Sequence, residues 1–282
     1  MDGQSPNSGQ PTASPATFRK QRLFEFNHPI PPASTLGLAF AAWFLFFGLW
    51  ELAVLMELTN AVLLPGPVKV ITSFVELFGE KNYLHDIGIS LYRIVVSFLL
   101  ACLLAVPLGI LMGTFRRVEA FFNPLVSAFR YLPAPSFIPL LLMWLGAGEA
   151  QKLALLFLGV VWFLITLIMD YAKSLPADFI NTALTLGGNR RQVLWTVVVP
   201  AMLPDILTAM RQMLAVSWTY LVIAEIVAAD SGIGAMMMRA KRFVHIDEIM
   251  AGIITIGLLG LIFDILLRRL RRMLFPYLES SE

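Results

Sequence analysis

Six apolar runs, each about as long as a membrane-spanning helix, dominate this chain of 282 residues. The hydrocarbon core of a bilayer is about 30 Å thick, so a helix needs roughly 20 apolar residues to cross it. We therefore expect an all-α membrane protein with about six transmembrane helices. The runs that meet this requirement are Leu36–Met56, Ser90–Met112, Pro124–Leu145, Leu153–Met169, Ile206–Ala229 and Ile249–Leu267.

The composition supports a membrane location and argues against other classes of protein. Hydrophobic residues make up 58% of the chain and charged residues 14%, whereas soluble domains contain about 45–50% and about 25%. One soluble core could not bury so much apolar surface. The net charge is only +2 and the basic residues lie at the ends of apolar runs, so nucleic acid is not an expected partner.

Basic residues indicate how the chain is oriented, because loops rich in Lys and Arg stay in the cytoplasm. If the N-terminus is inside, twelve basic residues are cytoplasmic and six lie on the opposite side. Both termini are therefore expected in the cytoplasm. The two groups are Arg19, Lys20, Arg22, Arg116, Arg117, Lys173, Arg190, Arg191, Arg268, Arg269, Arg271 and Arg272, against Lys69, Lys81, Lys152, Arg239, Lys241 and Arg242.

Three regions are expected along the chain. Residues 1–30 are rich in Pro, Ser, Gly, Gln and Asn, and we expect this cytoplasmic segment to be flexible. Residues 31–277 contain all six apolar runs and are expected to form one transmembrane domain. Residues 278–282 form a short tail.

A long patterned loop, residues 173–200, joins the fourth and fifth runs. Its first half predicts a short helix that Gly187-Gly188 stops in the left-handed conformation. Asn189 followed by Gln192 resembles a capping box, which predicts a second short helix, and Pro200 is expected to end it. The loop is therefore expected to form a helix–Gly–helix element on the cytoplasmic side.

This loop resembles that of the integral membrane permeases of bacterial ATP-binding-cassette importers that work with a periplasmic binding protein. The family loop reads Glu-Ala-Ala, three residues, Gly, then an apolar stretch ending in Leu-Pro. Asn181, Thr182 and Ala183 hold the Glu-Ala-Ala positions, Gly187 holds the glycine, and Val199-Pro200 holds the closing pair. The glycine and proline spacings match, but the Glu and the first Ala do not.

The resemblance covers roughly Leu63–Tyr277 and is similar to the nitrate/sulfonate/taurine/bicarbonate subgroup. It rests on the order and spacing of several short fragments. These are Ser90–Arg93, Pro107–Gly109, Pro124, Arg130–Pro133, Ile138–Leu140, Trp144–Gly146, Ser231–Gly234 and Ala251–Gly260.

The resemblance implies a type I ABC importer permease fold, in which a cytoplasmic coupling helix docks on an ATPase subunit. It implies a second copy of the permease, cytoplasmic ATP-binding-cassette subunits, a periplasmic binding protein, and surrounding lipid of the bacterial inner (plasma) membrane. The residues implied in ATPase coupling are Asn181, Thr182, Ala183, Gly187, Gly188, Arg190 and Pro200.

No enzymatic site is expected in this chain. It lacks a Gly-x-x-x-x-Gly-Lys-Ser/Thr phosphate loop, so ATP and Mg are expected on the partner ATPase and no cofactor on the chain itself. His28, His85 and His245 are scattered in predicted loops, and no metal site follows from them.

Charged residues inside apolar runs are costly and suggest a pathway, because they rarely face lipid. Arg211, Trp218 and Glu225 recur every seven residues on one stripe of the fifth run, with Ser217 beside them. The alternatives for the charged members are interhelical struts, interfacial anchors, or an Arg211 that extends its head to the membrane surface. Two further pathway candidates, for which a structural role is the alternative, are Arg93 and Arg130.

The expected function is ATP-driven import of a small solute by alternating access. Nitrate, bicarbonate, taurine and alkanesulfonates fit the subgroup, and an uncharged aromatic or pyrimidine precursor stays open. The first alternative is a gradient-driven secondary transporter or channel subunit, which would show repeated spans with paired broken helices. A membrane scaffold without transport is the second, and it leaves the patterned loop unexplained.

Overall fold

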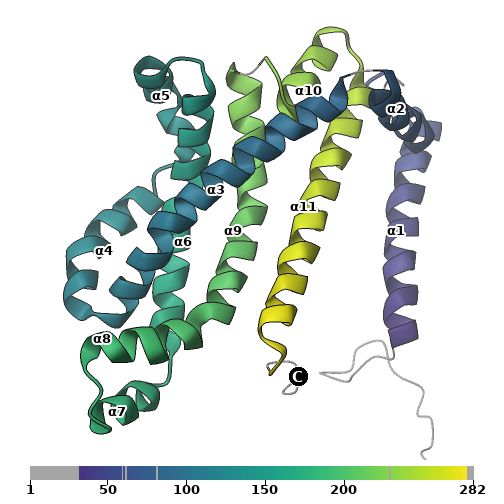
Figure 1. Ribbon diagram of the computed structural model, residues 1–282. Helices are drawn as coiled ribbons and strands as arrows, with labels where there is room; N and C mark the ends of the chain where they lie inside the picture. The colour runs from purple at the N-terminus through teal and green to yellow at the C-terminus, as the bar shows by residue number, and fades with distance from the viewer. Residues whose placement is uncertain (1–31, 59, 61, 81, 229, 278–282) are drawn as a thin grey trace, which may run out of the picture. The chain divides into compact units, whose positions relative to one another are not determined.

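The computed structural model describes residues 32–58, 60, 62–80, 82–228 and 230–277 (Figure 1). The segment 1–30, expected to be flexible, and the tail 278–282 lie outside these residues. All regular elements of the described residues are helical, which confirms the all-α expectation. In chain order they are α1 (Pro32–Leu55), α2 (Pro67–Glu80), α3 (Tyr83–Thr114), α4 (Arg116–Arg130), η1 (Ala134–Phe137), α5 (Ile138–Leu145), α6 (Glu149–Ser174), α7 (Ala177–Thr185), α8 (Arg190–Val193), η2 (Leu194–Val198), α9 (Val199–Ala228), α10 (Ile233–Arg242) and α11 (Ile246–Leu274).

The chain divides into two compact units, the first ending at Leu49 within α1 and the second running from Trp50 onward. The α1 portion of the first unit is strongly apolar and aromatic. Trp43 stacks on Phe47 there, with ring centroids 5.9 Å apart. All the elements from α2 to α11 belong to the second unit.

Five helices among the described residues are long and apolar enough to cross a bilayer, and a bent helix pair raises the number to six. This agrees with the six runs expected from the sequence. The third expected run is not one straight helix, however, because α4 and the η1–α5 segment meet at 86°. Pro133 precedes η1 and Pro135 lies in its first turn. Proline has no N–H for the helical ladder, so the chain turns here.

Two short helices, α2 and α10, lie outside the six expected runs. Each is amphipathic and packs its apolar face against the long helices. Leu77 of α2 and Met236 and Met237 of α10 are buried in one cluster with Tyr83 and Ala251. With 14 and 10 residues, both helices are too short to be recognised as membrane spans.

The core of the second unit lies between α3, α6 and α9, and α3 packs most extensively on α6. Small residues allow this close approach, as is common for helices in membranes. A Cβ atom on Gly109 of α3 would lie 2.8 Å from Ile168 Cβ and 2.9 Å from the Ile165 carbonyl oxygen of α6. The glycine therefore lets the two backbones touch.

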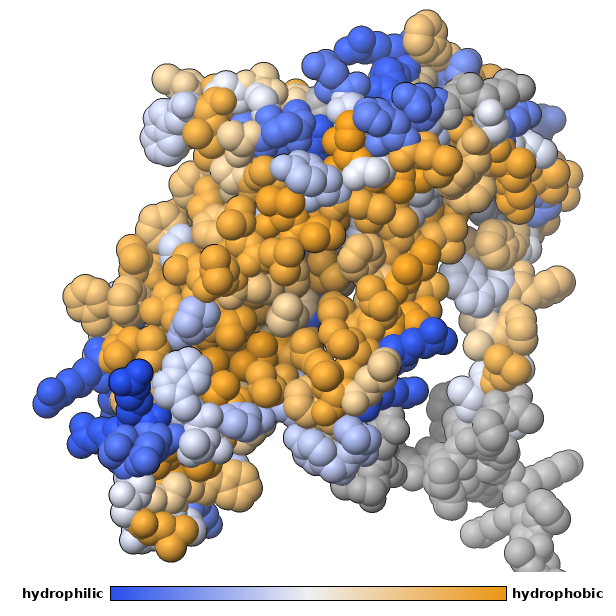
Figure 2. Space-filling view, viewed as in Figure 1, coloured by the Kyte–Doolittle hydropathy of each residue, from blue (hydrophilic) through white to orange (hydrophobic). Residues whose placement is uncertain are grey.

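The long helices of the second unit run between two ends that carry different short helices. One end carries α7, α8 and the last turn of α11, and the other carries α2 and α10 (Figure 1). Figure 2 shows a broad hydrophobic band between hydrophilic groups at these two ends. This distribution suits a protein whose middle lies in hydrocarbon and whose ends reach water.

Candidate functional site

The α7–α8 element, residues 177–193, has the helix–Gly–helix form that the sequence predicts. After α7, Gly187 adopts φ of 89°, a left-handed conformation that glycine tolerates best. Asn189 then caps α8. Gln192 N–H donates to Asn189 Oδ1 at 2.9 Å, and Asn189 N–H donates to Gln192 Oε1 at 3.0 Å. Both bonds of the capping box are present, which confirms that prediction.

One boundary in this region was predicted wrongly. Pro200 does not end the second short helix, because the chain stays helical from Arg190 through η2 and α9 to Ala228. The segment η2 is π-helical, and Val199 N–H bonds back to the Leu194 carbonyl oxygen. Pro200 is the second residue of α9, and a first turn tolerates proline. The α7–α8 element is therefore joined to the membrane-spanning α9 by continuous helix.

The α7–α8 element presents apolar side chains to the exterior. No residue of α7 is buried. Phe179 is 52% exposed and Leu186 83%, and Trp195 of the following segment η2 is 62% exposed. Ile180 and Ala183 of α7 are partly buried and pack against the core. These two residues attach the element to the protein, while the side chains of Phe179 and Leu186 stay exposed and apolar.

Of the coupling positions predicted from the sequence, Asn181, Thr182 and Ala183 lie on α7, and Gly188 directly precedes the cap of α8. A Cβ on Gly188 would lie 2.8 Å from the Ala183 carbonyl oxygen, so this position also requires a small residue. The sequence-matched residues therefore shape one continuous element, with Arg190 at the start of α8.

A cavity of about 210 Å³ lies between α9 and α11. Arg211 and Trp218 of α9 line it together with Asp264 of α11. The Nε atom of Arg211 is 2.9 Å from Asp264 Oδ1, and Arg268 Nη2 donates to Asp264 Oδ2 at 2.6 Å. Gly257 and Gly260 of α11 also line the cavity and contribute no side chain to it. Two of the six predicted pathway residues, Arg211 and Trp218, thus share a cavity.

Arg93 and Glu225, two further pathway candidates, lie together elsewhere. Both side chains have no exposed surface, and Arg93 Nη1 donates to Glu225 Oε1 at 2.7 Å. Glu149 of α6 accepts from Arg93 Nε at 2.7 Å and from Nη2 at 2.6 Å. The Ser231 carbonyl oxygen accepts a further bond from Nη1 at 2.7 Å. Every nitrogen of this guanidinium therefore has a protein partner.

The turn before α10 is hydrogen-bonded to Glu225 and to residues of α3 close to Arg93. Ser90 Oγ donates to Glu225 Oε1 at 2.7 Å and accepts from Ile233 N–H at 3.0 Å. Gly234 N–H donates to Glu225 Oε2 and Gly232 N–H donates to Asp86 Oδ1, each at 2.7 Å. Arg93 and Glu225 therefore join α3, α6, α9 and the turn into α10.

The remaining two pathway candidates join neither group. Ser217 donates its hydroxyl to the Met213 carbonyl oxygen of its own helix at 3.0 Å. Arg130, at the end of α4, lies over the Tyr131 ring at 5.3 Å from the centroid. The six residues of the predicted pathway are therefore divided among separate places in the fold.

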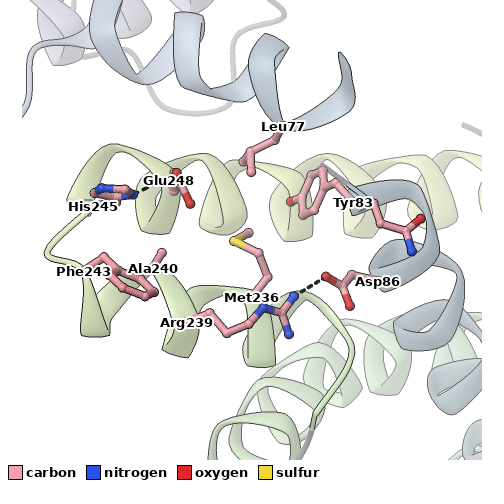
Figure 3. A pocket seen from close by; sticks show the side chains of 10 residues that line it. Leu77, Tyr83, Asp86, Met236, Arg239, Ala240, Phe243, His245 and Glu248 are labelled. Carbon is pink, nitrogen blue, oxygen red and sulfur yellow. Dashed lines mark hydrogen bonds and ion pairs between the residues drawn. The ribbon is translucent and has the colours of Figure 1, made fainter. Parts of the chain in front are cut away.

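A second cavity, of about 370 Å³, lies at the end that carries α2 and α10 (Figure 3). In its lining, Arg239 forms an ion pair with Asp86, and His245 Nδ1 lies 3.1 Å from Glu248 Oε1. Tyr83 donates its hydroxyl to Thr255 Oγ1 at 2.6 Å. The described residues contain no cluster of His, Cys, Asp or Glu that could hold a metal ion.

Asp264, Glu149 and Asp86 were not among the pathway candidates taken from the sequence. A charged residue inside an apolar run was the available signal for Asp264. Nothing in the sequence showed which arginine each carboxylate would meet.

Comparisons with known proteins place these features in one family. The family model described as "Binding-protein-dependent transport system inner membrane component" matches residues 105–279. "Taurine transport system permease protein TauC" of Escherichia coli (strain K12) is 31% identical over 261 residues, which cover 91% of this chain and 94% of that protein. "Putative aliphatic sulfonates transport permease protein SsuC" of Bacillus subtilis (strain 168) is 31% identical over 83% of this chain and 85% of that protein.

A solved structure of the MetNI methionine ABC transporter in an inward facing conformation has a similar fold. The TM-score is 0.60 at 18% identity, covering 68% of this chain and 95% of that one. This likeness confirms the ABC importer permease fold, and the relatives confirm the subgroup that the sequence resembled. The chain belongs to the binding-protein-dependent transport system inner membrane components, as a multi-pass protein of the inner membrane.

Proposed function

We propose that this chain is the membrane-spanning subunit of an ATP-driven importer that moves a small anion by alternating access. The observation that carries the proposal is the α7–α8 element. Its Phe179 and Leu186 side chains are exposed and available to a partner protein, and its C-terminal end continues as helix into α9. Single exposed apolar residues are ordinary, but several on a short projecting helix are typical of a docking surface.

The proposed partner at this surface is a cytoplasmic ATP-binding-cassette subunit. A push or pull on α7–α8 passes through continuous helix into α9, so nucleotide-driven movement of the ATPase would shift a membrane span. ATP and Mg belong to that subunit in this proposal, and this chain contributes no catalytic group and binds no cofactor.

The proposed orientation puts the α7–α8 element and both termini in the cytoplasm. Arg190 and Arg191 lie in this element, and Arg268, Arg269 and Arg271 lie in the last turns of α11. These basic residues belong to the end of the second unit that carries α7 and α8 (Figure 1). The positive-inside rule assigns that end to the cytoplasm. The opposite end, with α2 and α10, would then meet the periplasmic binding protein.

A second copy of the permease completes the proposed pathway, and membrane lipid surrounds the pair. The relatives, which are named for transport of taurine and of aliphatic sulfonates, support a proposal for the substrate class. We propose a small anion of this kind, with nitrate and bicarbonate as further members of the class. Arg211 and Trp218 are the pathway candidates that line a cavity in one subunit.

Gly187 offers a test of ATPase coupling. A side chain there would meet nothing within 4 Å but would be strained, because φ is 89°. Gly187→Val should therefore disturb the α7–α8 turn and leave the packed spans intact. Gly88→Val is the matched control, since Gly88 is also unobstructed and lies on the helix α3 without positive φ.

The measurement is uptake of radiolabelled taurine and methanesulfonate into proteoliposomes that contain the permease, its ATPase and its binding protein. ATP-dependent uptake by the unaltered complex, lost in Gly187→Val and kept in Gly88→Val, supports the proposal. Uptake that proceeds with a proton or sodium gradient and no ATPase contradicts it, as does full ATP-driven uptake by Gly187→Val.

A further inference from the structure

Arg93 of α3 and Arg211 of α9 differ in how their hydrogen-bond donors are used. Arg93 directs all three of its nitrogen atoms to protein acceptors. The one ion-pair or hydrogen-bond partner of Arg211 among the residues that the structure describes is Asp264, whose Oδ1 lies 2.9 Å from Nε. The Arg211 side chain is 32% exposed and lines the cavity between α9 and α11. The two terminal amino groups of Arg211 are therefore available to an acceptor in that cavity.

Trp218, which lines the cavity from the same helix as Arg211, provides a second hydrogen-bond donor. Trp218 is only 6% exposed, and its indole Nε1 donates to no acceptor among the described residues. A Cβ on Gly260 would lie 3.6 Å from this Nε1 and nothing would obstruct one on Gly257. The glycines thus leave space in front of the indole N–H, which can only donate a hydrogen bond.

The charges at this place favour an anion. Arg211 and Arg268 are two cations that share one carboxylate, Asp264. The rest of the cavity is apolar, lined by Leu214, Ala215 and Ile256. A planar guanidinium binds carboxylate, sulfonate or phosphate oxygens in a bidentate manner, and such bonds are stronger with little water present.

The size of the cavity limits what it can hold. Its volume of about 210 Å³ is below the ~300–1,000 Å³ of sites for drug-sized ligands. A single small oxyanion group fits this constraint, with its apolar remainder against Leu214 and Ile256.

We propose that the cavity between α9 and α11 is an anion subsite for a sulfonate or similar oxyanion group, with Arg211 and Trp218 as donors and Asp264 as the internal counter-ion that the cargo displaces. This inference rests on the proposed import function and assigns its cargo-binding residues. Asp264 holds Arg211 in place while the subsite is empty. An arriving anion binds the Arg211 guanidinium in place of Asp264, and Asp264 stays paired with Arg268.

The subsite lies on the helix that leaves the α7–α8 element. Arg211 is twelve residues beyond Val199, the first residue of α9, which is about 18 Å along a helix axis. A shift of α9 relative to α11 would change the Arg211–Asp264 distance and the width of the cavity together. The affinity for the anion would then differ between the two states of the transport cycle.

The experiment titrates the purified complex of permease and ATPase, in lipid nanodiscs, with methanesulfonate. Dimethyl sulfone, which has a similar shape and no charge, is the neutral probe. Binding is followed by calorimetry in the permease variants Arg211→Gln, Asp264→Asn and Trp218→Phe. Arg242→Gln removes an exposed arginine of α10 that does not line the cavity and serves as the charge-matched control.

Methanesulfonate should bind the unaltered complex and dimethyl sulfone should not. Arg211→Gln should weaken binding by about tenfold or more, the size of a lost charge-assisted hydrogen bond. Trp218→Phe, which keeps the ring and removes the N–H, should weaken it by a smaller factor. Asp264→Asn should strengthen binding, because the competing carboxylate is gone; a purely structural salt bridge gives no such gain.

The inference is overturned if the complex binds no methanesulfonate, if it binds the neutral probe equally well, or if Asp264→Asn fails to bind more tightly. Each variant is first checked for assembly with the ATPase and for its thermal midpoint. The proposed import function is tested separately. ATP-driven uptake that persists unchanged in Arg211→Gln contradicts the anion subsite but not the import function. Uptake by the unaltered complex that does not depend on ATP contradicts the import function, whatever the titration gives.

Discussion

Arg93 of α3 and Glu225 of α9 form an ion pair in which neither side chain has any exposed surface, with Nη1 and Oε1 2.7 Å apart. The pair joins helices that are far apart in the sequence and fixes the turn into α10 through Gly234 and Ser231. Two charges removed from water are costly, so such a pair is stable only when all their hydrogen bonds are satisfied. Here they are, which makes the pair a structural junction.

Arg93→Met should be strongly destabilising, by about 3–5 kcal/mol, because it leaves the Glu225 carboxylate buried without a cation. Glu225→Gln should cost less, since Arg93 keeps Glu149 as a partner. The measurement is the thermal midpoint of the detergent-solubilised subunit. The double variant Arg93→Met/Glu225→Gln should regain part of the loss of the arginine variant; a simple sum of the two losses would contradict a direct pairing.

Gly232→Ala should also be destabilising, by about 1–3 kcal/mol or more. Its φ is 109°, which side chains rarely adopt, and a Cβ there would collide with the Glu225 carboxylate. Gly257→Ala is the matched control, because nothing lies within 4 Å of its added Cβ. Equal melting temperatures for the two variants would contradict the positive φ of Gly232 and its close approach to the Glu225 carboxylate.

Gly109→Val should separate α3 from α6 and lower the yield of folded subunit. The new side chain would meet both the Ile168 side chain and the backbone of Ile165, and a backbone atom cannot move aside as a flexible side chain can. Overpacking of this kind typically costs about 1–3 kcal/mol. Gly88→Val on the same helix should have little effect, so size-exclusion profiles of the two variants provide the comparison.

Asn189→Ala should weaken coupling without unfolding the membrane domain. It removes the side-chain acceptor of Gln192 N–H at the start of α8, a loss of about 1 kcal/mol. Asn189→Asp retains an acceptor and should behave almost as the unaltered protein. The check is the ratio of substrate transported to ATP hydrolysed in proteoliposomes, which should fall only in the alanine variant.

The α7–α8 element shows what local sequence rules can establish. Gly187 and the Asn189–Gln192 capping box act within three or four residues, and the structure has them as predicted. The same rules failed at Pro200, because a π-helical segment absorbs the missing N–H and continues the helix into α9. Pro133 and Pro135 mark the bend between α4 and the η1–α5 segment, but local rules do not give its angle of 86°, because that angle depends on how these helices pack on α6.

The amino-acid sequence was enough to predict a helical membrane protein of about six spans, with a helix–Gly–helix element between two of them. That information lies in hydrophobic length and local capping, which can be recognised along the chain. Which charged residues pair became known only from the folded arrangement of the helices. Arg93 forms ion pairs with Glu225 and Glu149, and Arg211 forms one with Asp264 beside a cavity. Partner choice across helices depends on rotation, tilt and packing, which no spacing within a single helix can specify.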